Sequence, residues 1–186
     1  GYDARFVEGK NLVQIRYSES GQEVCWEETR KNWQTFLNGA SSSLLVIPGG
    51  LVGIQGGGMV SLNREGAEFC ASIFANLSDA KEVRIWSSSD GVMSADPSKV
   101  PGAEVVPELT YQEATELAFF GAEILHPHAM TPVMVKKIPL HIGNFFFPEQ
   151  RGTVISEKQG EDSGRPGKGF SIINDMCLLN IEGAGM

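Results

Sequence analysis

Apolar residues recur along this chain with two periods, and each period predicts a different kind of element. Apolar side chains spaced three or four residues apart predict helices over residues 23–37, 64–77 and 110–122. Short apolar or alternating runs predict strands over residues 11–17, 44–47, 51–54, 59–62, 82–86, 140–144 and 176–181. Strands that alternate with helices are typical of an α/β fold, here with a largely parallel sheet.

Local signals mark the ends of several of these helices. Thr110 and Glu113 have the T-x-x-E spacing of a capping box, in which each side chain satisfies a backbone amide of the other residue. Gly39 stands where the first helix is expected to stop. A shorter helix is predicted over residues 131–136, with Pro132 in its first turn and lysines at its end.

Two glycine-rich stretches separate these elements. The triple glycine at 56–58 lies between two extended runs, so a hairpin turn is favoured there over a phosphate-binding cradle. Residues 156–169 are polar and rich in glycine, serine and charge, which predicts a linker.

Composition excludes several classes of function. A net charge of −8 with scattered cations argues against nucleic acid as a partner. No apolar run has the length of a membrane span, and no signal peptide is visible. Cys25, Cys70 and Cys177 lie far apart, which argues against disulfides and zinc sites and fits a reducing cytoplasm. The histidine pair at 126 and 128 is interpreted as a polar turn, so no metal site is predicted.

The stretch WSSSDGVMSADP, residues 86–97, is the strongest candidate for chemistry. A strand runs there into a polar loop that carries Asp90-Gly91 and Asp96-Pro97. Loops of this kind lie at the carboxyl end of a sheet, where α/β proteins bind ligands. Asp-Gly and Asp-Pro are also ordinary turn formers, and both interpretations stay open.

Four segments in this order resemble the aspartokinases: DGVMSADPSKVPGAE, LTYQEATELAFFGAEILHP, IPLHIGNFFFPEQRGTVI and GKGFSIINDMCLLNIEGAGM. The resemblance implies an amino-acid-kinase-like, largely parallel sheet sandwiched by helices, followed by the start of an ACT-like α+β domain. The implied boundaries are a partial kinase domain at 1–155, a linker at 156–169 and the start of the ACT-like regulatory domain at 170–186.

The implied activity is ATP-dependent phosphorylation of the side-chain carboxylate of L-aspartate, in lysine, threonine and methionine biosynthesis. ATP and Mg²⁺ would be co-substrates, with no tightly bound cofactor. The ACT-like segment implies an end-product amino acid as effector and a homo-oligomer, and the implied location is cytoplasmic.

The resemblance also implies roles for individual residues. Arg64 and Gly66 would bind the substrate, and Glu68 would be catalytic because it retains the charge of the family's aspartate. Nucleotide binding is implied for Ser87, Asp90, Gly91 and Ile124.

The chain departs from the family's pattern at charge-handling positions. The departures are Glu65, Ala67, Ser88, Met93, Ser98 and Glu123. Glu65 would repel two anionic substrates, and Glu123 would reverse the field where the family has a lysine. A second hypothesis is therefore a catalytically inactive relative, a pseudokinase that binds an amino acid or a partner.

Purely structural interpretations stay open for several of these residues. Arg64 could be a solvated residue at a helix start, paired with Glu65. Glu123 is interpreted as a solvated charge at a helix end, and residues 145–147, three phenylalanines, as packing rather than base stacking.

We expect a fragment, because the sequence begins at Gly1 without methionine and ends at Met186 just after a strand-like run. The family's amino-terminal lysine-glycine-glycine loop would lie upstream, and any homoserine dehydrogenase portion would lie beyond Met186. The chain shows no Rossmann fingerprint of its own. The isolated chain is predicted to lack kinase activity.

Overall fold

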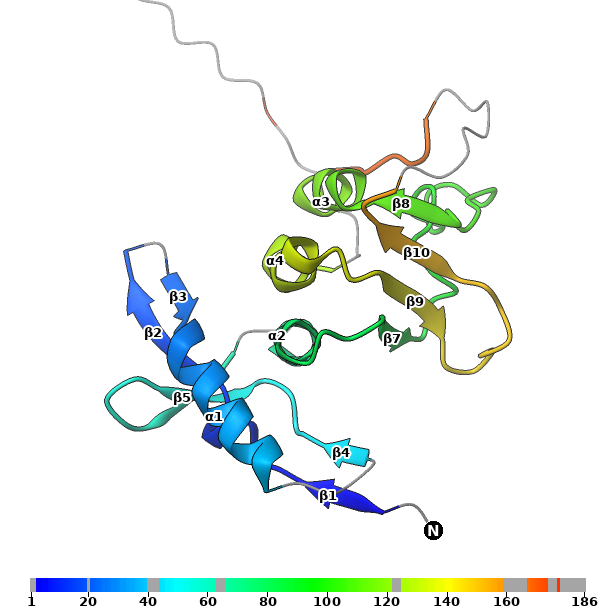
Figure 1. The fold of residues 1–186 in the computed structure, drawn as a ribbon. Helices are drawn as coiled ribbons and strands as arrows, with labels where there is room; N and C mark the ends of the chain where they lie inside the picture. Colours follow the sequence, from blue (N-terminus) through cyan, green and yellow to red (C-terminus); the bar gives the residue numbers. More distant parts are fainter. Residues whose placement is uncertain are drawn as a thin grey trace, which may run out of the picture.

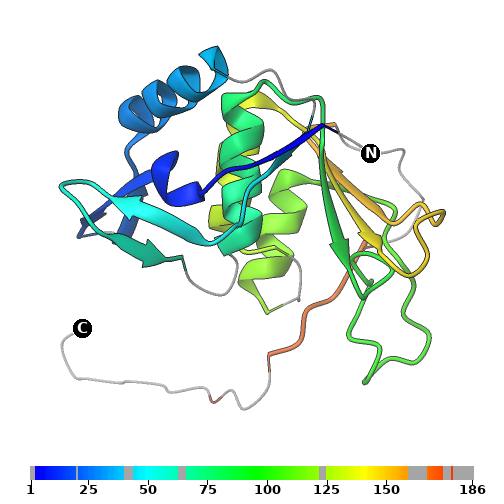
Figure 2. The same cartoon turned by 90° about the horizontal axis from the view of Figure 1, so that it is seen from below.

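A computed structural model describes residues 3–19, 21–39, 44–62, 66–121, 125–158, 167–173 and 177. Two four-stranded sheets flank the helix α2 (Gly66–Leu77), as Figures 1 and 2 show. α2 is apolar on two sides: Cys70 and Ile73 belong to the core of the first sheet, and Ala75 belongs to the core of the second. The helix therefore joins the two halves of the molecule through packing.

The first sheet contains β2 (Gln14–Ser18), β3 (Gly21–Val24), β5 (Leu51–Ile54) and β6 (Met59–Ser61), in the order β3-β2-β5-β6. The pair β2 and β5 is parallel, and the outer strands join by antiparallel hairpins. The triple glycine forms the turn of the second hairpin, as predicted, with positive φ at all three positions. A parallel pair, β1 (Ala4–Phe6) with β4 (Leu44–Val46), and the short helix η1 (Gly9–Asn11) lie beside this sheet.

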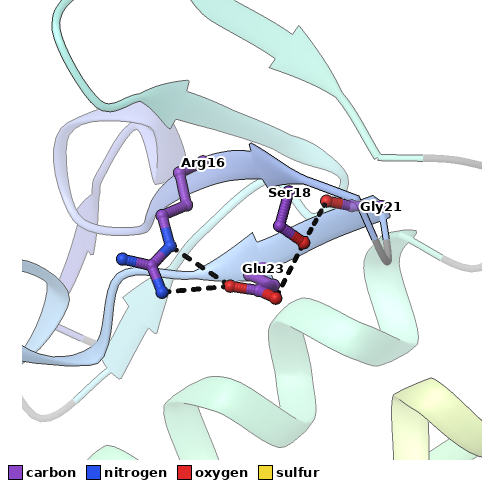
Figure 3. Close-up of polar contacts among 4 residues, drawn as sticks. All are labelled: Arg16, Ser18, Gly21 and Glu23. Atoms are coloured by element: carbon purple, nitrogen blue, oxygen red, sulfur yellow. Dashed lines mark hydrogen bonds and ion pairs between the residues drawn. The ribbon is translucent and has the colours of Figure 1, made fainter.

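The strand β3 corrects the predicted start of the first helix. Residues 23 and 24 pair with β2, and α1 (Trp26–Asn38) begins only after them. Figure 3 shows what holds this hairpin: Arg16 donates two hydrogen bonds of 3.1 Å to Glu23 Oε2, and Ser18 Oγ lies 2.7 Å from Glu23 Oε1. Charged cross-strand pairs suit an exposed edge strand, because they oppose pairing with other chains.

The second sheet has the order β7-β9-β10-β8 and contains β7 (Val83–Ser87), β9 (Leu140–Asn144), β10 (Thr153–Ser156) and β8 (Glu108–Thr110). The pair β9 and β10 is antiparallel, whereas β7 with β9 and β8 with β10 are parallel. The prediction of a largely parallel sheet is therefore wrong, since both four-stranded sheets are mixed. The cause is that β10 and β3 each follow their partner strand through a short connection, which reverses the chain direction.

Helices cover one face of the second sheet. α2, α3 (Tyr111–Phe119) and α4 (Pro127–Lys136) all lie on the same side of it in Figure 1. Along β9, Leu140, Ile142 and Asn144 are buried and the residues between them are partly exposed. Within the described residues, the predicted sandwich with helices on both faces is thus replaced by a one-sided layer.

The helix ends follow the local signals in part. The capping box is confirmed, because Glu113 N donates to Thr110 Oγ1 (3.1 Å) and Thr110 N donates to Glu113 Oε2 (2.7 Å). The predicted helix 131–136 begins earlier, at Pro127, with His126 as its N-cap. Pro127 suits the first helical position because it has no amide hydrogen to leave unpaired.

The described residues that follow the second sheet include contacts with α3. Lys168 and Gly169, within the predicted linker, contact this helix. The strand predicted at 176–181 lies almost wholly outside the described residues, and no ACT fold is evident in the part of 170–186 that the structure describes.

Candidate functional site

A cavity of about 150 Å³ lies where β7 and β9 end and α2 begins. It is lined by Glu68, Ile85, Trp86, Ser87, Ser89, Gly91, Val92, Leu125 and Ile142. Three residues singled out in the sequence, Glu68, Ser87 and Gly91, come together here. Their side of the sheet is its carboxyl edge, where α/β folds bind ligands.

A short serine turn follows β7 at the mouth of this cavity. Ser89 N donates to Ser87 Oγ (3.2 Å), and the hydroxyls of the two serines lie 3.1 Å apart. The Ser87 carbonyl accepts from Phe145 N (3.0 Å), which ties the turn to the chain after β9. Both hydroxyls are thereby held beside the cavity, and both can donate to a ligand once the hydrogen bond between them is exchanged for one to the ligand.

Asn144, the last residue of β9, holds the next part of the loop. Its buried amide donates from Nδ2 to Asp90 Oδ1 (2.8 Å) and to the Ser88 carbonyl (3.2 Å). Its Oδ1 accepts from Phe146 N (2.9 Å). Asp90 is exposed and is absent from the cavity lining, so its observed contact is with the sheet.

Gly91 sits where a side chain has no room. Its φ is +146°, and a Cβ added there would lie 2.6 Å from Thr153 Oγ1. Thr153 is fully buried; its hydroxyl donates to the Val106 carbonyl (2.7 Å) and accepts from Val92 N (2.8 Å). Thr153 thus holds both ends of the 92–106 loop against the sheet.

Gly66 has a packing role in the described structure. It is buried at the start of α2, and a Cβ added there would lie 2.7 Å from Leu62 Cβ and 2.8 Å from Gly50 Cα. Glu68 follows in the first turn, where the helix dipole favours a carboxylate. Arg64 and Glu65, like Glu123 and Ile124, lie outside the described residues.

Glu68 is the only ionisable side chain among the described residues that line the cavity. The part of the chain that the structure describes contains no cluster of three or more His, Cys, Asp or Glu side chains able to hold a metal. One carboxylate and two hydroxyls are nevertheless ligands that suit Mg²⁺, which keeps waters and phosphate oxygens as its other ligands.

Comparison with known proteins decides the family. Residues 5–144 match the model of the amino acid kinase family. The chain belongs to the amino acid kinase family. Within it, the chain groups with the aspartokinases: it is 33% identical over 191 residues to bifunctional aspartokinase/homoserine dehydrogenase 1, chloroplastic, of Arabidopsis thaliana. That match covers 100% of this chain and 21% of the relative.

The fold agrees with solved aspartokinases. E. coli aspartokinase III in complex with aspartate and ADP has a TM-score of 0.77 at 23% identity, covering 86% of this chain and 36% of that one. The same enzyme in complex with lysine and aspartate has a TM-score of 0.70 at 24% identity, covering 85% and 36%. The chain therefore has the amino acid kinase fold. It spans 36% of the length of the E. coli enzyme and 21% of the length of the Arabidopsis relative.

In the outer part of the loop at residues 88–107, Asp96 forms a turn. Asp96 Oδ1 accepts from Ser98 N (2.9 Å) and Ser98 Oγ (2.6 Å). These hydrogen bonds, that from the Ser98 hydroxyl foremost, hold the pKa of Asp96 below its usual value. The turn-forming interpretation of Asp96 accounts for both of these side-chain contacts, and the hydroxyl of Ser98 is occupied by the hydrogen bond to Asp96.

The three phenylalanines after β9 are exposed, although the sequence predicted that they would be packed. Phe145, Phe146 and Phe147 are 52%, 64% and 57% exposed. The Phe145 and Phe146 rings contact each other in a tilted arrangement, with centroids 3.8 Å apart and ring planes at 34°. The half-exposed Trp86, which lines the cavity, lies on the neighbouring strand over Gly143. The kinase domain therefore carries exposed aromatic surface beside the cavity.

Sequence reasoning missed Asn144 and Thr153. Both are buried polar residues at the ends of apolar strands, and together they hold the loop through four side-chain hydrogen bonds to residues 88–106. The available signal was a polar residue closing or opening a strand-like run, as in IPLHIGN and GTVI.

Proposed function

We propose that this chain forms the nucleotide side of an aspartokinase active site, which phosphorylates the side-chain carboxylate of L-aspartate with ATP. The observation that supports this most directly is the meeting of Glu68, Ser87 and Gly91 at one cavity. These residues come from two separate motifs of the aspartokinase resemblance, and α2 and the β7 loop bring them to the carboxyl edge of one sheet.

The proposed reaction requires positioning above all. A carboxylate oxygen of aspartate attacks the γ-phosphorus, the bond from that phosphorus to the β–γ bridging oxygen breaks, and ADP leaves with those electrons. Both reactants are anions, so the enzyme must hold them together. In our proposal the hydroxyls of Ser87 and Ser89 donate to phosphate oxygens, and Gly91 lets the backbone approach the nucleotide closely.

In our proposal the carboxylate of Glu68 binds Mg²⁺, which enters the site as a co-substrate with ATP. This carboxylate is the one anionic ligand of the described lining, and the serine hydroxyls add oxygen donors. The bound ion would neutralise charge on the phosphates. Arg64 remains the proposed contact for the substrate carboxylate, and Asp90 and Ile124 remain proposed nucleotide contacts.

The test is aspartate-dependent release of ADP by the full-length protein and by Glu68→Gln. We expect turnover about a hundredfold lower in Glu68→Gln, the size of effect seen when one transition-state contact is lost. Glu27→Gln is the matched control, because Glu27 also lies in the first turn of a helix, α1, and is exposed. Equal turnover in the three proteins would contradict the role of Glu68.

A second candidate is the catalytically inactive relative. It is favoured by the lining itself, in which the described residues supply a carboxylate and no cation. The substitutions Glu65, Ser88, Ser98 and Glu123 point the same way. A folded full-length protein that binds an amino acid but shows no thermal shift with Mg-ATP would select this candidate.

Regulation, assembly and location remain part of the proposal. E. coli aspartokinase III has been solved with lysine, so we propose an end-product amino acid as effector, acting through an ACT-like region, in a homo-oligomer. We also propose that the isolated chain of 186 residues is inactive. None of the helices in the described residues is long and apolar enough to span a membrane. A cytoplasmic location is a proposal, and the Arabidopsis relative is chloroplastic.

A further inference from the structure

Residues 167–173 lie along α3 and contact its amino-terminal capping box. Lys168 Nζ donates to Glu113 Oε2 at 2.9 Å, and the same oxygen accepts from Thr110 N at 2.7 Å. Gly169 lies against Leu117 of the same helix, where an added Cβ would be 3.5 Å from both methyl carbons. This segment is therefore seated on α3 by an ion pair and by close packing.

The segment also contacts the loop that lines the cavity. Phe170 N donates to the Ser94 carbonyl (2.8 Å). Ser94 is paired across the loop as well, because its amide donates to the Glu104 carbonyl (2.7 Å) and its hydroxyl accepts from Glu104 N (3.0 Å). Ser94 is two residues from Val92, which lines the cavity. The segment thus contacts the outer part of the 88–107 loop through one backbone hydrogen bond, at a residue that is itself paired across the loop.

This ion pair is less exposed to solvent than the other ion pairs of the described residues. The side chains of Lys168 and Glu113 are 25% and 31% exposed, compared with 64% and 57% for Lys137 and Glu157. Exposed pairs contribute little because water and salt screen them. Burial alone would raise the pKa of Glu113, but the hydrogen bonds from Thr110 and Lys168 outweigh it and leave this pKa below its usual value.

We propose that the 167–173 segment positions the 88–107 loop around the cavity, with Lys168 as a positioning residue that anchors it on α3. Asn144 and Thr153 hold the loop from the sheet, and the segment contacts it at Ser94. The role in catalysis rests on the proposed function, because the loop is taken to contact the nucleotide. A binding event that displaces the segment would loosen the loop, and nucleotide would in turn favour the seated segment.

Hydrogen exchange of the full-length protein without ligand tests the structural part directly. In Lys168→Met we expect peptides from 92–106 to exchange about tenfold faster, the lower end of the effect of losing one charged hydrogen bond, because the pair is only partly buried. Lys168→Arg should restore the wild-type rates. Lys10→Met, which removes an ion pair with Glu8 near the first sheet, is the control and should leave these peptides unchanged.

Nucleotide binding supplies the second measurement. We expect the Kd of a Mg-bound, non-hydrolysable ATP analogue to rise by the same factor in Lys168→Met, at a melting temperature close to that of Lys10→Met. Faster exchange confined to 167–173, with 92–106 unchanged, would overturn the inference. A wild-type protein that binds no nucleotide would overturn the proposed function, while the exchange of 92–106 would still decide whether Lys168 positions the loop.

Discussion

Two cavities of this molecule are built in different ways. The larger, of about 470 Å³, lies beside the first sheet and is lined by residues 5–8, 11, 12, 31, 32, 35 and 36, which come from two stretches of chain. Arg5, one of two cationic residues in this lining, lies over the Phe36 ring, 4.7 Å from the centroid, and donates to the Gly39 carbonyl. The smaller cavity gathers residues from α2, β7 and its loop, residue 125 and β9.

The difference between them lies in the buried polar groups. Beside the smaller cavity, Asn144 and Thr153 form hydrogen bonds to a loop without regular structure. Buried polar side chains are costly unless satisfied, so their use on a loop indicates that its conformation matters. Cavity volume alone favours the larger cavity, whereas the convergence of distant segments around a fixed loop favours the smaller one, where we propose the site.

The largest expected effect comes from filling the space at Gly91. Gly91→Ala places a Cβ against Thr153 Oγ1 at a backbone conformation that disfavours side chains. We expect the free energy of unfolding to fall by about 3 kcal/mol, measured by urea denaturation. Gly102→Ala is the control, because nothing lies within 4 Å of its added Cβ. Equal stability of the two variants would show that the loop adapts freely.

Removing the Thr153 hydroxyl contrasts the two cavities directly. Thr153→Val leaves Val92 N and the Val106 carbonyl without their partner, which we expect to cost about 2 kcal/mol. Thr35→Val changes an exposed threonine that lines the larger cavity and should stay within about 0.5 kcal/mol of wild type. Denaturation curves of both variants measure this, and similar losses would remove the distinction between the cavities.

The smallest effect at neutral pH is expected at Tyr111, whose hydroxyl donates to the Ile138 carbonyl in the core of the second sheet. Tyr111→Phe should cost about 1 kcal/mol at pH 7. Burial raises the pKa of Tyr111 from its usual 10 to about 12. The unfolded chain therefore loses this proton first, and stability falls between pH 10 and pH 12 by about 1.4 kcal/mol per unit.

The variant should lose that part of the pH dependence. Tyr17→Phe, at an exposed position of the first sheet, should retain the wild-type curve. The measurement is the free energy of unfolding from pH 9 to pH 12. A Tyr111→Phe curve parallel to that of wild type would contradict a neutral, buried phenol.

Local patterns predicted the elements better than their pairing. The capping box at Thr110 and Glu113 is a signal within four residues, and the structure contains it. The antiparallel pairing of β10 with β9, and of β3 with β2, follows from short connections between consecutive strands, which the alternation of predicted strands and helices does not reveal. The start of α4 at Pro127 was missed because the helix was placed around Pro132, which lies inside it.

The candidate site was predictable to a similar degree. Glu68, Ser87 and Gly91 were singled out through motif resemblance, and the structure places them at one cavity. Asn144 and Thr153 were missed because each acts on a loop 47 to 61 residues away in sequence. Exposure of the three phenylalanines was missed because apolar composition alone favours burial.

The most direct test maps where nucleotide binds to the full-length protein. Hydrogen exchange is measured with and without a Mg-bound, non-hydrolysable ATP analogue. We predict protection of residues 85–92 and of the start of α2, the segments that line the smaller cavity. Protection confined to residues 5–12 and 31–36, at the larger cavity, or to neither region, would contradict the placement of the nucleotide at the carboxyl edge of the second sheet.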